Sequence, residues 1–139
     1  MYSKLFILLL FLGAASCKDS EKGALPCNEI TPGAYFDARI HDTWCLPDES
    51  LKITFDRILE DSRCNVIGID CIWAGRTVIA LKIDSETAGL YTDTLATDES
   101  WKGSIDAPGY TLSLDEIKPD IRTNIAVDTA TYRFKMLLE

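Results

Sequence analysis

The chain has 139 residues, of which 47% are hydrophobic and 26% charged, and its formal net charge at pH 7 is −8. A chain of this length forms one domain. Because it is acidic and has no basic patch, its charge disfavours binding to the phosphate backbone of nucleic acids. With only one histidine, a metal site built from several histidines is excluded.

The N-terminus begins with a short targeting pattern. Lys4 precedes the apolar run Leu5–Leu12, and the small residues Gly13–Ser16 lead directly to Cys17. The run is too short for a transmembrane helix, which needs about 20 apolar residues. Its order of charge, apolar run and small residues is typical of a cleaved secretory signal. One alternative is an ordinary secretory signal that is cleaved without attachment of a lipid.

The cysteine at the end of this pattern makes it similar to a bacterial lipoprotein signal. That resemblance implies a signal peptide at 1–16 and a lipid, such as palmitate, attached covalently to Cys17. It also implies an outer membrane lipoprotein, at the cell surface or facing the periplasm. Residues 17–26 are mostly polar and predict an acidic tether, followed by one domain at 27–139.

Four cysteines follow the lipidation site: Cys27, Cys45, Cys64 and Cys71. An even number in a small exported domain is typical of disulfides, and four cysteines allow three pairings. We expect the nearest-neighbour pairing, Cys27–Cys45 and Cys64–Cys71. A zinc site is the alternative, but the chain lacks the paired C-x₂-C spacing of such sites.

The domain shows the period-2 alternation of half-buried strands. A weak candidate spans Tyr35 to Ile40, and the stronger ones are carried by Leu51, Ile53 and Phe55; Ile79, Leu81 and Ile83; Tyr110, Leu112 and Leu114; and Tyr132, Phe134, Met136 and Leu138. The adjacent Ile58 and Leu59 break the alternation and predict a bulge.

Turns are expected at Pro32-Gly33, Pro47-Asp48, Ala74-Gly75, Pro108-Gly109 and Pro119-Asp120. Thr111 to Glu116 could form one helical turn. These patterns predict an all-β fold, either a single small β-sandwich of immunoglobulin-like type or a partly open barrel, with two disulfides.

The most distinctive internal motif is Asp61-Ser62-Arg63-Cys64, followed by Cys71-Ile72-Trp73-Ala74-Gly75. It resembles an uncharacterised bacterial lipoprotein family in which a strand, this turn, a second cysteine and a Trp-Ala-Gly turn follow one another. The resemblance supports the all-β domain and implies no activity.

Two interpretations of the motif compete. In the structural one, the Cys64–Cys71 bridge clamps a strand connection, Arg63 pairs with an acidic neighbour, Asp61 accepts local backbone hydrogen bonds and Gly75 permits a tight entry to the next strand. In the functional one, the apolar residues of the bridged loop dock into a partner protein of the envelope or extracellular space. Its residues are Val66, Ile67, Ile69 and Trp73.

The sequence gives little support for a catalytic site or a metal site. His41 lies between Ile40 and Asp42, which predicts an edge or turn residue, and no serine lies in a nucleophile elbow. An acidic stretch predicts a solvated loop, with weak calcium binding as the alternative. Its residues are Asp84, Glu86, Asp93, Asp98 and Glu99.

The sequence thus predicts a lipid-anchored cell-envelope protein that acts as a non-catalytic interaction or structural module. The alternatives are a protease-inhibitor-like binding domain, and a carbohydrate-binding or hydrolase accessory domain that uses Trp44 or Trp101. We expect a monomer attached to the membrane through acyl chains, with no metal, no nucleic acid partner and no cofactor other than the lipid on Cys17.

Overall fold

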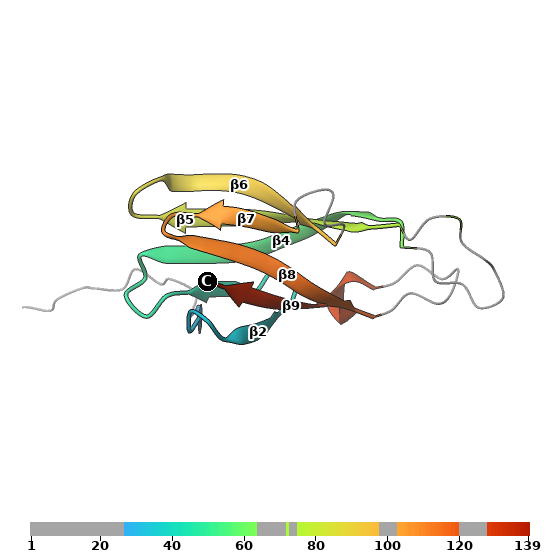
Figure 1. The fold of residues 1–139 in the computed structure, drawn as a ribbon, viewed down its shortest axis with the longest axis horizontal. Coiled ribbons are helices and arrows are strands. Elements are labelled where there is room, and N and C mark those ends of the chain that lie inside the picture. The colour runs from blue at the N-terminus through green and yellow to red at the C-terminus, as the bar shows by residue number, and fades with distance from the viewer. Residues whose placement is uncertain (1–26, 64–71, 73–74, 98–102, 120–127) are drawn as a thin grey trace, which may run out of the picture.

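The computed structural model describes residues 27–63, 72, 75–97, 103–119 and 128–139. These residues form two β-sheets that face each other, and Figure 1 shows the four-stranded sheet in front of the five-stranded one. The five-stranded sheet has the order β1-β3-β4-β5-β6, with β1 Asn28–Glu29, β3 Thr43–Cys45, β4 Leu51–Asp61, β5 Thr77–Ser85 and β6 Gly89–Ala96. The four-stranded sheet has the order β2-β9-β8-β7, with β2 Tyr35–Ala38, β7 Ser104–Ala107, β8 Tyr110–Lys118 and β9 Arg133–Leu138.

The strand order follows the chain. From β3 to β6 and from β7 to β9 each strand pairs with the next, and β2 pairs with β9. All these pairs are antiparallel, while the short β1 is parallel to β3. The chain changes sheet three times, between β1 and β2, between β2 and β3 and between β6 and β7, and the two sheets are not closed into a barrel. The runs β3–β6 and β7–β9 are meanders, whereas immunoglobulin domains have Greek-key connections. The prediction of an all-β fold is confirmed.

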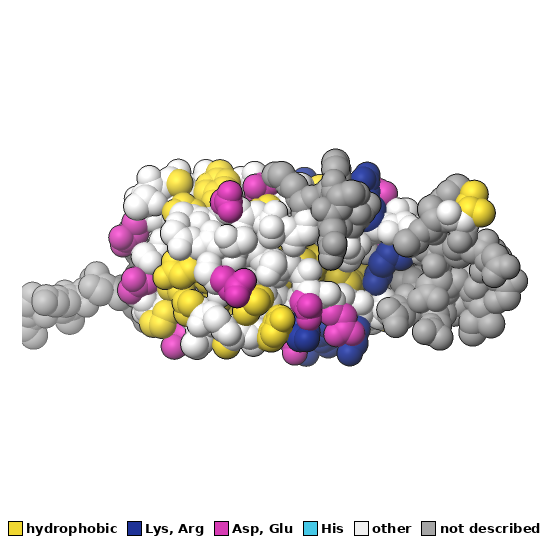
Figure 2. Space-filling model, in the orientation of Figure 1, with side chains coloured by type: hydrophobic (Ala, Val, Ile, Leu, Met, Phe, Trp, Pro, Cys, Tyr) yellow, Lys and Arg dark blue, Asp and Glu magenta, His cyan; other side chains and the backbone are white. Residues whose placement is uncertain are grey.

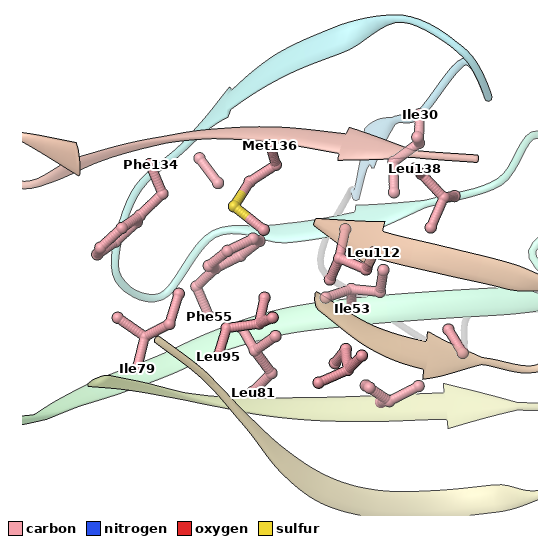
Figure 3. Packing of buried hydrophobic residues seen from close by; sticks show 14 of the residues in the cluster. Ile30, Ile53, Phe55, Ile79, Leu81, Leu95, Leu112, Phe134, Met136 and Leu138 are labelled. Atoms are coloured by element: carbon pink, nitrogen blue, oxygen red, sulfur yellow. The ribbon is translucent and has the colours of Figure 1, made fainter. Parts of the chain in front are cut away.

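The period-2 runs of the sequence supply the core. Their inward side chains fill the space between the two sheets, as Figure 3 shows, and most of them are fully buried. Phe55 of β4 and Phe134 of β9 stack across the layers with their ring centroids 5.9 Å apart. Burial of a large apolar side chain stabilises the fold by about 1.5–3 kcal/mol, so this shared core accounts for the association of the sheets.

The break in alternation on β4 corresponds to two shifts of register against β5. One lies between Phe55 and Arg57 and the other between Ile58 and Glu60. Ile58 packs against the core, whereas Leu59 stays 48% exposed on the outer face. The predicted bulge is confirmed: the first shift brings Ile58 to the inner face, and the second returns Asp61 to that face.

Two sequence predictions are wrong. The segment from Thr111 to Glu116 forms no helical turn, because it is extended within β8. Part of the expected acidic loop is also extended: Asp84 belongs to β5 and Asp93 to β6, and the strands are paired in register. Asp93 lies on the edge strand β6, which keeps charged side chains in contact with water, and Asp84 lies near the end of β5 with its side chain exposed. Asp98 and Glu99 lie outside the described residues.

The molecule has two distinct ends (Figure 1). The proximal end, where the domain begins, contains the turn after β3 and the C-terminal Glu139, and Gly33 N–H there donates to Leu138 O at 2.7 Å. The distal end is the opposite one, where β4 and β8 end and where β5 and β9 begin. Within the described residues, no helix has the length and hydropathy needed to cross a bilayer.

Candidate functional site

The described part of the sequence motif lies at the distal end, where β4 passes into the connection toward β5. The ladder between the two strands continues one step beyond Asp61, because Ser62 N–H donates to Arg76 O at 2.8 Å. Gly75 has a φ of +66°, and a Cβ there would lie 1.9 Å from Ser62 O. No side chain fits such a contact, so the predicted tight entry to β5 depends on glycine.

Four side chains meet on the inner face of this end and form what we call the Asp61 cluster: Asp61, Arg63, Thr77 and Tyr132. One carboxylate oxygen, Oδ1, accepts from Arg63 Nε at 3.0 Å and from Thr77 Oγ1 at 3.1 Å. The other, Oδ2, accepts from Arg63 Nη2 at 2.9 Å and from the Tyr132 hydroxyl at 2.6 Å. Each oxygen therefore has two side-chain donors, which meet the needs of a buried carboxylate.

The cluster links the two sheets. Asp61 and Thr77 belong to the five-stranded sheet, while Tyr132 immediately precedes β9 of the other sheet. Arg63 Nη1 donates to the backbone oxygen of Ile117 in β8 at 3.3 Å, and its guanidinium carbon lies 6.0 Å from the centre of the Tyr132 ring. The base of the β4–β5 connection is thereby fixed to both layers of the sandwich.

Burial makes these contacts strong. The side chains of Asp61 and Arg63 are 10% and 15% exposed, and Thr77 is fully buried. Burial by itself raises the pKa of the Asp61 carboxyl, but hydrogen bonds from Arg63 and Tyr132 outweigh it and hold that pKa below its ordinary value. Burial and the hydrogen bond to Asp61 raise the pKa of Tyr132 to about 12. At neutral pH the cluster thus contains one anion, one cation and two neutral hydroxyls.

The alternate residues of the same segment point outward and form a second, exposed group. Arg76 Nη2 contacts Glu60 Oε2 at 3.0 Å, and Ser62 Oγ donates to Glu60 Oε1 at 2.9 Å. Hydrogen bonds from Arg76 and Ser62 lower the pKa of the Glu60 carboxyl. Because strand side chains alternate, the motif places its Asp and Arg inside and its Ser outside.

The predicted pairing of Arg63 with an acidic neighbour is confirmed, as is the backbone hydrogen bond to Asp61, from Arg63 N–H at 3.3 Å. Thr77 and Tyr132 were not predicted. Tyr132 lies 71 residues from Asp61, and no local pattern connects the two positions. Thr77 is directly opposite Asp61 on β5, so a correct strand register would have found it.

The other predicted site residues divide into observed and undescribed ones. The Cys27–Cys45 disulfide is present, with a Cα–Cα distance of 5.8 Å, as predicted. Cys17, the Cys64–Cys71 pair, the loop residues Val66, Ile67, Ile69 and Trp73, and Trp101 lie outside the described residues. Next to that loop, the described Ile72 has a side chain that is 86% exposed.

Two further candidates, His41 and Trp44, are described and lie apart from the Asp61 cluster. His41 lies in the turn before β3 with a φ of 73°, and its N–H donates to Phe55 O at 2.6 Å. The Trp44 ring lies 4.7 Å from that of Phe36 and packs against the core, so its faces are largely covered. In the described ranges, no three His, Cys, Asp or Glu side chains are placed to hold a metal ion.

A hollow of about 420 Å³ lies between the outer face of the four-stranded sheet and Thr97, which follows β6. Ser104, Ser113 and Asp115 also line it, and Asp115 pairs with Lys135 at 2.8 Å. Figure 2 shows this face, with basic side chains concentrated toward the distal end. Such a lining offers hydrogen bonds to a polar ligand and no nucleophile that is paired with a base.

No protein-family model, curated protein or solved structure matches this chain. The resemblance to a lipoprotein family therefore stays a prediction from the motif. At the distal end, the described residues form an ion-paired base that holds the two ends of the β4–β5 connection in place.

Proposed function

We propose that this chain is a lipid-anchored protein of the bacterial outer membrane, and that its β-domain is a non-catalytic interaction or structural module. The Cys17 pattern supports the anchor, and the Cys27–Cys45 bridge is of the kind that persists in oxidising compartments. The domain begins at the proximal end, so an anchor at Cys17 attaches the chain nearest that end and leaves the distal end accessible to a partner.

The Asp61 cluster is the observation that carries the proposal. It fixes the base of the β4–β5 connection to both sheets through charged hydrogen bonds. A connection held in this way loses less conformational entropy on binding a partner than a free one does. Its apolar residues Val66, Ile67 and Ile69, with Trp73, then serve as the contact surface.

Replacing Cys17 with serine tests the anchor. We expect the native protein to sediment with the outer membrane and to have the mass of the segment Cys17–Glu139 plus acyl chains. Cys17→Ser should lack the acyl mass and should leave the membrane fraction. A native protein without acyl mass refutes the lipid anchor, whereas an acylated variant shows that another residue carries the lipid.

A protease-inhibitor-like domain is the second candidate, because inhibitors present a loop on a rigid base. Purified serine and cysteine proteases are the probes, and inhibition constants are the readout. This proposal predicts inhibition that Ile67→Asp abolishes while urea unfolding of the domain is unchanged. If the unsubstituted protein inhibits none of them, the inhibitor interpretation fails and the anchored module remains.

The hollow favours the carbohydrate-binding or accessory alternative, because its polar lining suits a polar ligand. Of the two tryptophans predicted for this role, Trp44 is packed against Phe36 and Trp101 lies outside the described residues. Titration with soluble peptidoglycan fragments tests this alternative. Binding should be lost in Trp101→Ala and kept in Ile67→Asp, the reverse of the inhibitor pattern. No binding, or binding unaffected by Trp101→Ala, refutes the alternative.

A further inference from the structure

The outer margin of the five-stranded sheet is an unusual edge. Among the described strands, four stand at sheet edges, and β6 is the longest of them with eight residues, against four in β2, four in β7 and two in β1. Short strands, lysines, prolines and bulges commonly protect edges from pairing with another chain. The β6 sequence Gly-Leu-Tyr-Thr-Asp-Thr-Leu-Ala contains neither lysine nor proline, and its register with β5 is unbroken. Its inward-pointing charge, Asp93, lies in the second half of the strand and leaves the first half without such protection.

The register shows which backbone groups of β6 face outward. Thr97 N–H donates to Thr77 O at 3.1 Å, which fixes this pair as a hydrogen-bonded one. Since such pairs alternate along an antiparallel ladder, Leu95, Asp93 and Tyr91 also bond to β5. The N–H groups of Leu90, Thr92 and Thr94 therefore point away from the sheet. In agreement, Thr94 N–H donates to the Asp93 carboxylate at 2.7 Å.

The first half of this edge is accessible. The side chain of Leu90 is 72% exposed and Thr92 is exposed, whereas Leu95 and Ala96 are buried. The neighbouring edge of β7 is partly occupied, because the Tyr91 hydroxyl donates to Asp106 O at 3.5 Å. An incoming strand can therefore pair with β6 at Leu90 and Thr92. The backbone N–H of each residue points away from the sheet, and Leu90 also has an exposed apolar side chain.

Charge around the edge selects the incoming strand. Asp84 lies opposite Leu90 on β5 and shares its outer face, whereas Asp93 lies opposite the buried Leu81, on the inner face. Asp106 is exposed on β7 of the other sheet. The adjacent cation, Lys82, is bound to Asp56 of β4 at 2.5 Å, away from the margin. β6 forms the upper margin in Figure 1, and along its left half Figure 2 shows acidic and hydrophobic side chains but no basic one.

We propose that the β6 edge, from Leu90 to Thr92, is a docking site for an extended basic peptide segment that adds as a further antiparallel strand. Main-chain hydrogen bonds provide the binding, and lysines or arginines on the outer face of the added strand lie beside Asp84. A second copy of this chain is a poor occupant, since two β6 strands would bring acidic edges together and each chain carries a charge of −8. The site is independent of the lipid anchor and of the segment 64–74.

A synthetic peptide of about seven residues, with alternating Lys and Val, is the probe. Full-length protein labelled with ¹⁵N is titrated with it, and amide exchange is measured. We expect about tenfold or greater protection of the Leu90 and Thr92 amides on binding, and affinity about tenfold weaker in 0.5 M salt than in 0.05 M salt. The same peptide with Glu in place of Lys should not bind.

Matched variants separate edge pairing from simple charge attraction. Thr92→Pro removes one outward N–H and should weaken binding at least tenfold, while Thr92→Val keeps that N–H and should bind within about twofold of the native protein. A peptide N-methylated on alternate residues leaves the protein unaltered and should not bind, which covers the case in which the proline variant fails to fold.

Protection elsewhere on the molecule, or equal binding of the methylated peptide, overturns the proposal. A dimer whose Leu90 and Thr92 amides are already protected without peptide identifies a second copy as the occupant and also overturns it. Because Ile67→Asp and Cys17→Ser leave β6 unchanged, a failure here is distinguishable from a failure of the proposed function.

Discussion

Replacing Asp61 with alanine should lower the free energy of unfolding by about 3 kcal/mol, because it breaks a buried ion pair and leaves its partners in place. The Arg63 side chain is 15% exposed, and two of its guanidinium N–H groups would lose their acceptor. The buried hydroxyls of Thr77 and Tyr132 would lose the same acceptor. A hydrogen bond to a charged group contributes about 1.5–3 kcal/mol, so the loss of all of them would exceed this figure if no water replaced the carboxylate.

The matched control is Glu60→Ala, one residue earlier on the same strand. It removes the same charge and also breaks an arginine ion pair, but Glu60 and Arg76 are 41% and 33% exposed. Exposed pairs contribute about 0–1 kcal/mol, so this variant should be nearly as stable as the native protein. Both are compared by equilibrium urea unfolding, read out as the midpoint and slope of the transition.

The difference between the two variants is what tests the reasoning. If Asp61→Ala costs less than about 1 kcal/mol, or no more than Glu60→Ala, then the cluster does not hold the distal ends of the sheets together. A smaller denaturant slope for Asp61→Ala alone would mean that the distal end opens separately from the rest of the domain.

Three further predictions follow from the same geometry. Tyr132 ionises near pH 12 when folded, so its stabilising contribution is present below about pH 10 and lost as pH rises toward 12; Tyr132→Phe should remove the late step in a titration of tyrosinate absorbance. Gly75→Ala should lower the free energy of unfolding in urea by about 3 kcal/mol. Gly33 has a φ of +81° but open space around it, so Gly33→Ala should lower it by about 1 kcal/mol. Equal losses would refute the close contact at Gly75. Replacing both Cys27 and Cys45 with alanine should cost about 3 kcal/mol, and an unchanged unfolding midpoint would contradict this.

The sequence predicts those features of the fold that depend on the residue pattern within a single strand. The runs around Phe55, Leu81, Leu112 and Phe134 alternate because one face of each strand enters the common core. The bulge on β4 is visible for the same reason, since two adjacent apolar residues cannot both point inward at regular pleating.

The rest of the fold depends on contacts between distant segments. The sequence of β6 predicts part of an acidic loop because it shows no run of alternating apolar residues, and in the structure only Leu95 and Ala96 at its end are buried. Its status as a strand comes from pairing with β5, and no property of its own sequence expresses that pairing. In the same way, the motif identifies Asp61 and Arg63 as candidate residues, but no residue near them in the sequence indicates Tyr132.

The two charges of the cluster are not interchangeable, and this gives the sharpest test of why the motif has its order. Asp61 accepts from the hydroxyls of Thr77 and Tyr132, while Arg63 donates to the backbone oxygen of Ile117. Exchanging the pair, as Asp61→Arg with Arg63→Asp, restores their attraction but sets the new carboxylate against a carbonyl oxygen. The double variant should therefore be no more stable than Asp61→Ala in urea unfolding, because both polar surroundings are wrong. Recovery of native stability would show that the mutual attraction of the two charges is sufficient, and that the surrounding donors and acceptor add little.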